Sequence, residues 1–97
     1  MISIENDNYV VNPPTELTIH TIEGFVENIK NELVGNRDIV LNLADISEID
    51  SAGFQVLIAL KNEALKRSVS LKINDMSPEV YEIITLYGVH TFIENNK

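Results

Sequence analysis

The stretch that most constrains the fold runs from a strand pattern into a long helix pattern. Ile39–Leu43 is almost continuously apolar and rich in β-branched residues, so we expect a strand buried on both faces. From Ser51 or Ala52 to about Lys66 the apolar residues recur with helical spacing. Only small or hydrogen-bonding residues form the junction, Asp50-Ser51-Ala52-Gly53. A hydroxyl there lies beside the backbone N–H groups that a helix leaves free.

Short strand patterns and one helix pattern come before this unit. We expect strands at Ile2–Ile4 and Tyr9–Val11 around the turn-forming Asn6-Asp7-Asn8, and a third at Leu17–Ile19. Asn12-Pro13-Pro14 interrupts them, because proline donates no backbone hydrogen bond. An amphipathic helix follows over residues 22–33, and Gly35-Asn36 predicts its end, with the left-handed conformation usual there.

Another strand and another helix follow the long helix. Val69–Ile73 alternates as a strand with one covered face. Ser77-Pro78-Glu79 predicts a helix start, with an N-cap hydroxyl and proline at the first helical position. Val80, Ile83, Ile84 and Tyr87 form the expected apolar face, Gly88 the end, and Thr91–Ile93 a last short strand. This alternation predicts an α/β fold, with a mixed sheet of four to five strands packed by three to four helices. The 97 residues suit one domain, 1–97.

Charge and composition exclude several classes of partner. A net charge of -8 argues against nucleic acid and anionic membranes. With no cysteine there is no disulfide framework and no thiolate metal site. No stretch approaches the apolar length of a membrane span, and Glu5 and Asp7 stand where a signal peptide needs a basic region. We therefore expect a cytoplasmic protein.

The sequence offers little support for an enzyme. Nucleophilic catalysis by Ser51 needs a base; His20 and His90 are the only histidines, both are distant in sequence, and no Gly-x-Ser-x-Gly motif is present. Metal-ligand spacing and a glycine-rich phosphate loop are also lacking, so we expect no metal, no cofactor and no ATP hydrolysis by this chain. Asp50 is rejected as the phosphoaspartate of a receiver domain, because the acidic pair and late lysine of that fold are not evident.

The order of these elements resembles the STAS domain, the family of bacterial anti-sigma-factor antagonists and related modules. The resemblance rests on Ile49–Phe54 between strand and helix, on the strand Leu71–Ile73 and on Ser77-Pro78-Glu79, and it spans about residues 17–93. It implies that Ser51 is phosphorylated by an ATP-dependent serine kinase of the anti-sigma type and dephosphorylated by a metal-dependent serine phosphatase. The unphosphorylated form would bind the kinase or anti-sigma partner, and the phosphorylated form would be released.

Two departures from the family pattern matter, and the one at Ala52 leaves the pathway open. Ala52 stands where some sporulation-type members have a second serine, and Asp-Ser-Ala-Gly also occurs in STAS modules near chemotaxis and lipid-transport systems. The alternative function is therefore a constitutive subunit that docks on a larger assembly, such as a lipid-transport ATPase or a chemotaxis complex, without phosphorylation. The segment 12–15 replaces a glycine-rich stretch, which leaves the shape of one partner loop open.

The residues at the junction also allow two interpretations each. Ser51 is either the N-cap of the helix, or its first residue with a freer hydroxyl if Asp50 caps. Gly53 either lets a partner approach the backbone or packs against the sheet, and Phe54 and Ile58 are either core or contact. If they are exposed, we expect the partner to contact the helix start, at Asp50, Ser51, Ala52, Gly53, Phe54, Gln55 and Ile58. The oligomeric state stays open.

Overall fold

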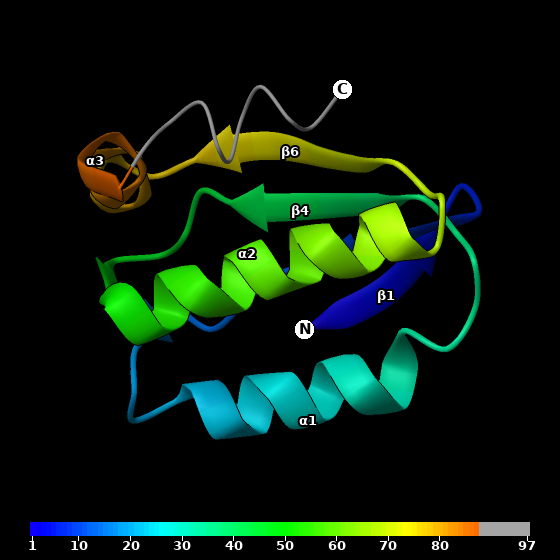
Figure 1. Cartoon of the computed structure of the whole chain (residues 1–97), viewed down its shortest axis with the longest axis horizontal. Helices are drawn as coiled ribbons and strands as arrows, with labels where there is room; N and C mark the ends of the chain where they lie inside the picture. The colour runs from blue at the N-terminus through cyan, green and yellow to red at the C-terminus, as the bar shows by residue number, and fades with distance from the viewer. Residues whose placement is uncertain (88–97) are drawn as a thin grey trace.

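A computed structural model describes residues 1–87 as a mixed sheet, a second small sheet and three helices (Figure 1). The elements in chain order are β1 (Ile2–Glu5), β2 (Asn8–Val11), β3 (Glu16–Leu17), α1 (Ile22–Glu32), β4 (Ile39–Leu43), β5 (Glu48–Ile49), α2 (Ser51–Lys66), β6 (Leu71–Met76) and α3 (Pro78–Tyr87). The expected α/β fold class is confirmed. Gly88, His90 and the expected strand Thr91–Ile93 lie outside the described residues.

The main sheet has the strand order β1-β2-β4-β6. β1 and β2 are antiparallel, whereas β4 runs parallel to both of its neighbours, β2 and β6. The apolar run of β4 is explained by its central place, since β2 and β6 flank it. Burial is complete on one face only, because Val40 and Asn42 are half-buried while the other three residues of β4 are buried.

The β1–β2 hairpin closes through a two-residue turn. Asn6 and Asp7 both have positive φ, 51° and 70°, and Glu5 pairs with Asn8. Two left-handed residues give the backbone twist that joins antiparallel strands tightly, and Asn and Asp tolerate it better than most side chains. The expected hairpin is confirmed, although Asn8 belongs to the strand and not to the turn.

β3 and β5 form a separate parallel pair, with Glu16 opposite Glu48 and Leu17 opposite Ile49. The expected strand Leu17–Ile19 is wrong beyond Leu17. The N–H of Thr18 donates to Thr21 Oγ1 at 3.0 Å, so the backbone leaves the ladder there and turns toward α1. This small sheet positions the start of α2, which follows β5 after a single residue.

α1 ends earlier than its glycine suggested. The helix is capped at Leu33, with φ -87° and ψ 67°, and neither Gly35 nor Asn36 has a positive φ, so the expected left-handed stop is wrong. Gly35 instead donates its N–H to the Tyr9 hydroxyl at 2.8 Å. A Cβ at Gly35 would lie 3.1 Å from that hydroxyl, a tight contact that a small shift of the tyrosine would relieve.

The last strand begins later than expected, and the last helix begins where expected. After α2 the chain turns through Ser68, at φ 58°, and the ladder starts at Leu71, so Val69 and Ser70 do not belong to β6. Its pairing with β4 extends to Met76. Ser77 Oγ accepts the N–H of Val80 at 3.3 Å, which confirms the N-cap of α3.

The core lies between the main sheet and the helices. α1 and α2 lie side by side, and α3 lies beyond the end of β6, near the start of α2 (Figure 1). Leu65, one of the apolar residues in the helical pattern of α2, is 57% exposed and does not belong to the core. Within residues 1–87 no helix has the length and apolar character needed to cross a bilayer. The buried apolar residues are Tyr9, Val11, Leu17, Phe25, Leu33, Ile39, Leu41, Leu43, Ile46, Phe54, Leu57, Leu60, Ala64, Leu71, Val80 and Ile84.

Candidate functional site

Asp50 fixes the start of α2 and ties it to the loop after β3. Its backbone is extended, at φ -118° and ψ -175°, and its Oδ1 accepts the N–H of Gly53 at 2.9 Å. Its Oδ2 accepts the N–H of Ile19 at 3.0 Å. One carboxylate thus satisfies a free N–H of the helix and a backbone donor 31 residues earlier. Asp50, and not Ser51, is the N-cap.

The same hydrogen bonds set the charge state of this carboxylate. The N–H of Ile19, followed by that of Gly53, lowers the pKa of Asp50 below its usual 3.8, and burial opposes them only in part. Donors that point at a carboxylate stabilise its ionised form. A fixed negative charge therefore lies next to Ser51 at neutral pH.

Ser51 is the exposed first residue of α2, and its hydroxyl is not used for capping. Ser51 Oγ instead lies 2.7 Å from the hydroxyl oxygen of Tyr87, the last residue of α3. The hydroxyl thus faces the surface and makes one hydrogen bond to a side chain 36 residues away. This geometry leaves Ser51 accessible to another protein.

Tyr87 also covers a side chain of α2. Its ring stacks on the ring of Phe54, with centroids 5.5 Å apart and planes 18° from parallel. Phe54 is only 5% exposed, whereas Tyr87 is 50% exposed. Tyr87 was expected on the apolar face of α3, and its contact with Ser51 was missed. Its helical spacing carries no information about which distant residue it meets.

Gly53 is buried against the backbone of β3. A Cβ at this position would lie 2.0 Å from the carbonyl oxygen of Leu17 and 2.8 Å from its carbonyl carbon. No real Cβ tolerates such a distance to backbone atoms, so only glycine allows α2 to approach β3 this closely. Packing against a strand accounts for Gly53, and its backbone is not open to a partner in this conformation.

The other expected contact residues differ in their exposure. Gln55 is exposed, Ala52 and Ile58 are half-buried, and Phe54 is buried under Tyr87. The surface around the start of α2 is therefore formed by Ser51, Gln55 and Tyr87, with Ile58 at its edge. Of the two interpretations of Phe54, the structure supports a core residue, because it is buried and an aromatic ring from another helix stacks on it.

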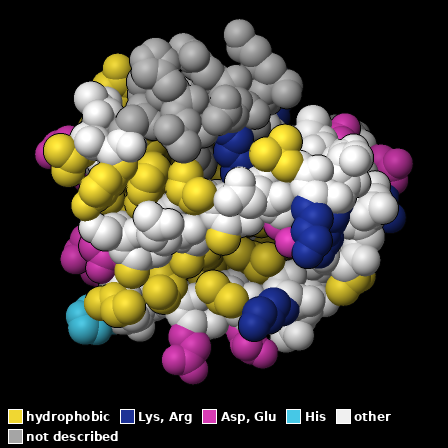
Figure 2. Space-filling view, in the orientation of Figure 1, with side chains coloured by type: hydrophobic (Ala, Val, Ile, Leu, Met, Phe, Trp, Pro, Cys, Tyr) yellow, Lys and Arg dark blue, Asp and Glu magenta, His cyan; other side chains and the backbone are white. Residues whose placement is uncertain are grey.

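A furrow of about 380 Å³ separates α1 from α2, where apolar side chains gather (Figure 2). Arg67 lies at one end, where Nη1 donates to the carbonyl oxygen of Leu33 at 2.6 Å and Nε to Glu63 at 2.8 Å. These bonds hold the guanidinium, so its role there is to join the two helices. The furrow is lined by Val26, Ile29, Lys30, Val56, Ala59, Leu60, Glu63 and Arg67.

The residues considered for catalysis or metal binding do not gather into a site in the described part of the chain. His20 is exposed in the loop between β3 and α1, and His90 is not among the described residues. Among residues 1–87, no three histidine, aspartate or glutamate side chains are placed to hold one metal ion.

Comparisons with known proteins agree with this fold. A family model described as STAS domain matches residues 1–97, the whole chain. No curated protein matches the sequence. Among solved structures, the NMR structure of the protein TM1081 is similar, with a TM-score of 0.76 and 20% sequence identity. The similarity covers 96% of this chain and 76% of that chain, and at this identity it shows a shared fold only.

Proposed function

Since the chain belongs to the STAS domain family, we propose that it is a non-enzymatic switch that binds a protein partner and is released when Ser51 is phosphorylated. The family generally mediates protein–protein interactions, and its fold is that of the anti-sigma-factor antagonists. The partner would be a serine-kinase-type anti-sigma factor or an equivalent sensor. We expect such a switch to act in the cytoplasm, where ATP is available to the kinase.

The observation that supports this proposal is that Asp50, and not Ser51, is the N-cap of α2. Because Asp50 caps α2, the hydroxyl of Ser51 remains at the surface and carries no N-cap bond. In the kinase reaction the Ser51 oxygen attacks the γ-phosphorus of ATP. The bond between that phosphorus and the oxygen that bridges it to the β-phosphate breaks. ADP leaves, and the hydroxyl proton passes to a base of the kinase. A metal-dependent serine phosphatase would hydrolyse the ester and restore the hydroxyl.

Phosphorylation would change the surface more than the fold. It adds roughly -1.5 to -2 charges and three acceptor oxygens. The N–H of Gly53 already donates to Asp50, so that helix donor is unavailable to the phosphate, and the Asp50 carboxylate lies beside it. The phosphate therefore extends toward solvent, and the Ser51–Tyr87 hydrogen bond cannot persist unchanged. Desolvating this dianion at an interface would oppose partner binding.

A second function is favoured by the Ser51–Tyr87 hydrogen bond itself. This bond gives the hydroxyl a structural role between α2 and α3 that needs no phosphate. The chain would then be a constitutive subunit, with Ser51 and Gln55 at a permanent interface of a lipid-transport ATPase or a chemotaxis complex.

Intact-mass measurement after incubation with ATP and an anti-sigma-type serine kinase separates the two functions. We expect one added phosphate in the parent and in Ser70→Ala, a control at another exposed serine, and none in Ser51→Ala. Stable binding without a mass change would support the constitutive subunit. A Ser51→Asp variant that binds the partner as tightly as the parent would contradict the switch.

A further inference from the structure

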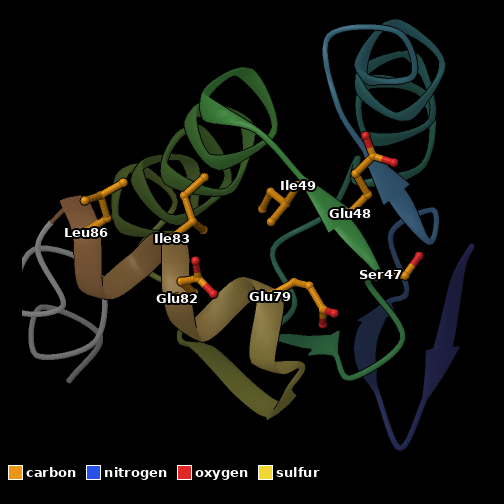
Figure 3. A pocket seen from close by; sticks show the side chains of 7 residues that line it. All are labelled: Ser47, Glu48, Ile49, Glu79, Glu82, Ile83 and Leu86. Atoms are coloured by element: carbon orange, nitrogen blue, oxygen red, sulfur yellow. The ribbon is translucent and has the colours of Figure 1, made fainter.

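A second surface groove lies between β5 and α3, next to Ser51 in the chain. It has a volume of about 350 Å³ and is bounded by the last residues of β5 and by one face of α3 (Figure 3). Its size suits a few side chains of a peptide. Ile49 lies two residues before Ser51, and Leu86 directly precedes Tyr87, so the groove adjoins the proposed switch. It is lined by Ser47, Glu48, Ile49, Glu79, Glu82, Ile83 and Leu86.

Apolar side chains form one part of this groove. Ile49 and Ile83 are half-buried, and their remaining surface faces the groove (Figure 3). Leu86 is 75% exposed at the end nearest Tyr87. An exposed leucine contributes no buried apolar surface to folding. Its apolar surface is therefore available for a partner to cover.

Carboxylates form the rest of the groove, and no residue in the described part of the chain neutralises them. Glu79 and Glu82 come from α3, one turn apart. Glu48 comes from β5 and lies at the rim, with its side chain on the other side of the strand from Ile49 (Figure 3). Within residues 1–87 none of these three carboxylates makes an ion pair or a hydrogen bond, and no lysine or arginine lines the groove. The protein's net charge of -8 extends the negative potential around them.

We propose that this groove binds a basic amphipathic segment of the protein partner. Apolar side chains of that segment would cover Ile49, Ile83 and Leu86, and its lysine or arginine residues would pair with Glu79 and Glu82, while Glu48 adds negative charge at the rim. Charge complementarity selects such a segment, because an acidic one would be repelled by Glu48, Glu79 and Glu82 together. A lipid surface rich in anionic headgroups is disfavoured for the same reason.

This inference deepens the proposed function and rests on its claim of a protein partner, but not on phosphorylation. A basic segment in the groove would also be attracted to a phosphate on Ser51. The groove therefore contributes affinity in both states, and release has to come from the changed contacts of Ser51 and Tyr87. Electrostatic attraction between the groove and a basic segment of the kinase would speed the encounter of the kinase with Ser51.

The test uses the full chain and a short synthetic peptide of leucine and lysine residues. We expect the peptide to shift the backbone amide NMR signals of Glu48, Ile49, Ile83 and Leu86. The same peptide with glutamate in place of lysine should leave them unchanged, and added salt should weaken binding. Shifts confined to the furrow between α1 and α2, or spread evenly over the protein, would overturn the proposal.

Two matched double variants separate the groove from the overall charge. Glu79→Gln with Glu82→Gln removes a first-turn and a mid-helix carboxylate from α3, and Glu23→Gln with Glu27→Gln removes the equivalent pair from α1. Both change the net charge equally. We expect the α3 pair to weaken peptide binding roughly tenfold, as for two surface ion pairs, and the α1 pair less than about twofold. Equal losses would mean attraction by net charge alone and would overturn the groove.

A Ser51→Ala variant separates failure of the groove from failure of the switch. It cannot be phosphorylated at residue 51, yet it should bind the peptide as tightly as the parent. Loss of peptide binding in this variant would show that the peptide binds at the serine and not in the groove, and it would overturn the inference. Absence of phosphate on the parent, by contrast, would contradict the switch and leave the peptide result standing.

Discussion

The hydroxyl oxygens of Ser51 and Tyr87 lie 2.7 Å apart, and this contact joins the first residue of α2 to the last residue of α3. The same tyrosine ring covers Phe54, one turn into α2. A chemical change at Ser51 therefore acts on the residue that shields an apolar side chain of the proposed partner surface. Tyr87 thus connects Ser51 to Phe54, through its hydroxyl on one side and its ring on the other.

Substitutions of Tyr87 separate its hydroxyl from its ring. Tyr87→Phe removes one hydrogen bond between partly exposed groups and should lower the free energy of unfolding by about 0.5–1 kcal/mol. Tyr87→Ala also removes the stacked ring and should cost about 1 kcal/mol more. Urea unfolding followed by circular dichroism measures both. Equal losses in the two variants would show that the stacking on Phe54 contributes nothing.

Two glycines in helices should respond to alanine in opposite directions. Gly53→Ala places a Cβ against the carbonyl group of Leu17, so α2 must move away from β3, at a cost of about 3 kcal/mol. Gly24→Ala, in the exposed face of α1, meets nothing within 4 Å and should stabilise the protein by about 0.5–1 kcal/mol. Thermal unfolding of both variants provides the comparison. A Gly53→Ala protein as stable as the parent would contradict the close packing.

The fold was predictable wherever one residue pattern decides the structure alone. Helical spacing gave α1 and α2, and the cap at Ser77 gave the start of α3. The errors have two sources. The strand ladder ends at Leu17 because of a local turn that the strand pattern did not indicate, in which the N–H of Thr18 donates to Thr21 Oγ1. Gly35, by contrast, donates to the hydroxyl of Tyr9, 26 residues away, and no local pattern contains that contact.

The candidate site was predictable only in part, for the same reason. The junction Asp50-Ser51 is visible in the sequence, but which of the two caps α2 depends on Ile19, whose N–H takes the second oxygen of Asp50. Tyr87 reaches Ser51 only because α3 lies across the end of the sheet. The groove beside it combines β5 with α3, and no single segment carries its pattern.

Arg67 should stabilise the end of α1 through its guanidinium geometry. It donates to the carbonyl oxygens of Leu33 at 2.6 Å and Gly35 at 3.2 Å. Arg67→Met should lower the free energy of unfolding by about 1–2 kcal/mol, because charged donors to these carbonyls are lost. Arg67→Lys should recover less than half of that, since an ammonium cannot reproduce the planar fork. Lys66→Met, at an exposed neighbour, is the control and should stay within about 0.5 kcal/mol of the parent in urea unfolding.

Asp50 should make the free energy of unfolding decrease as the pH falls into the acid range. Its pKa is lower in the folded protein than the usual 3.8, because the N–H groups of Ile19 and Gly53 donate to the carboxylate. Folding therefore favours the ionised form, so its contribution is full above about pH 4 and is lost as the pH falls through the folded pKa. Asp50→Asn keeps one acceptor oxygen for the cap but not the second, and should cost about 1 kcal/mol at pH 7. In urea unfolding the difference between variant and parent should shrink below pH 3.8 as the parent's carboxylate protonates. A difference that stays constant down to that pH range and beyond would mean that the charge of Asp50 does not hold β3 to α2.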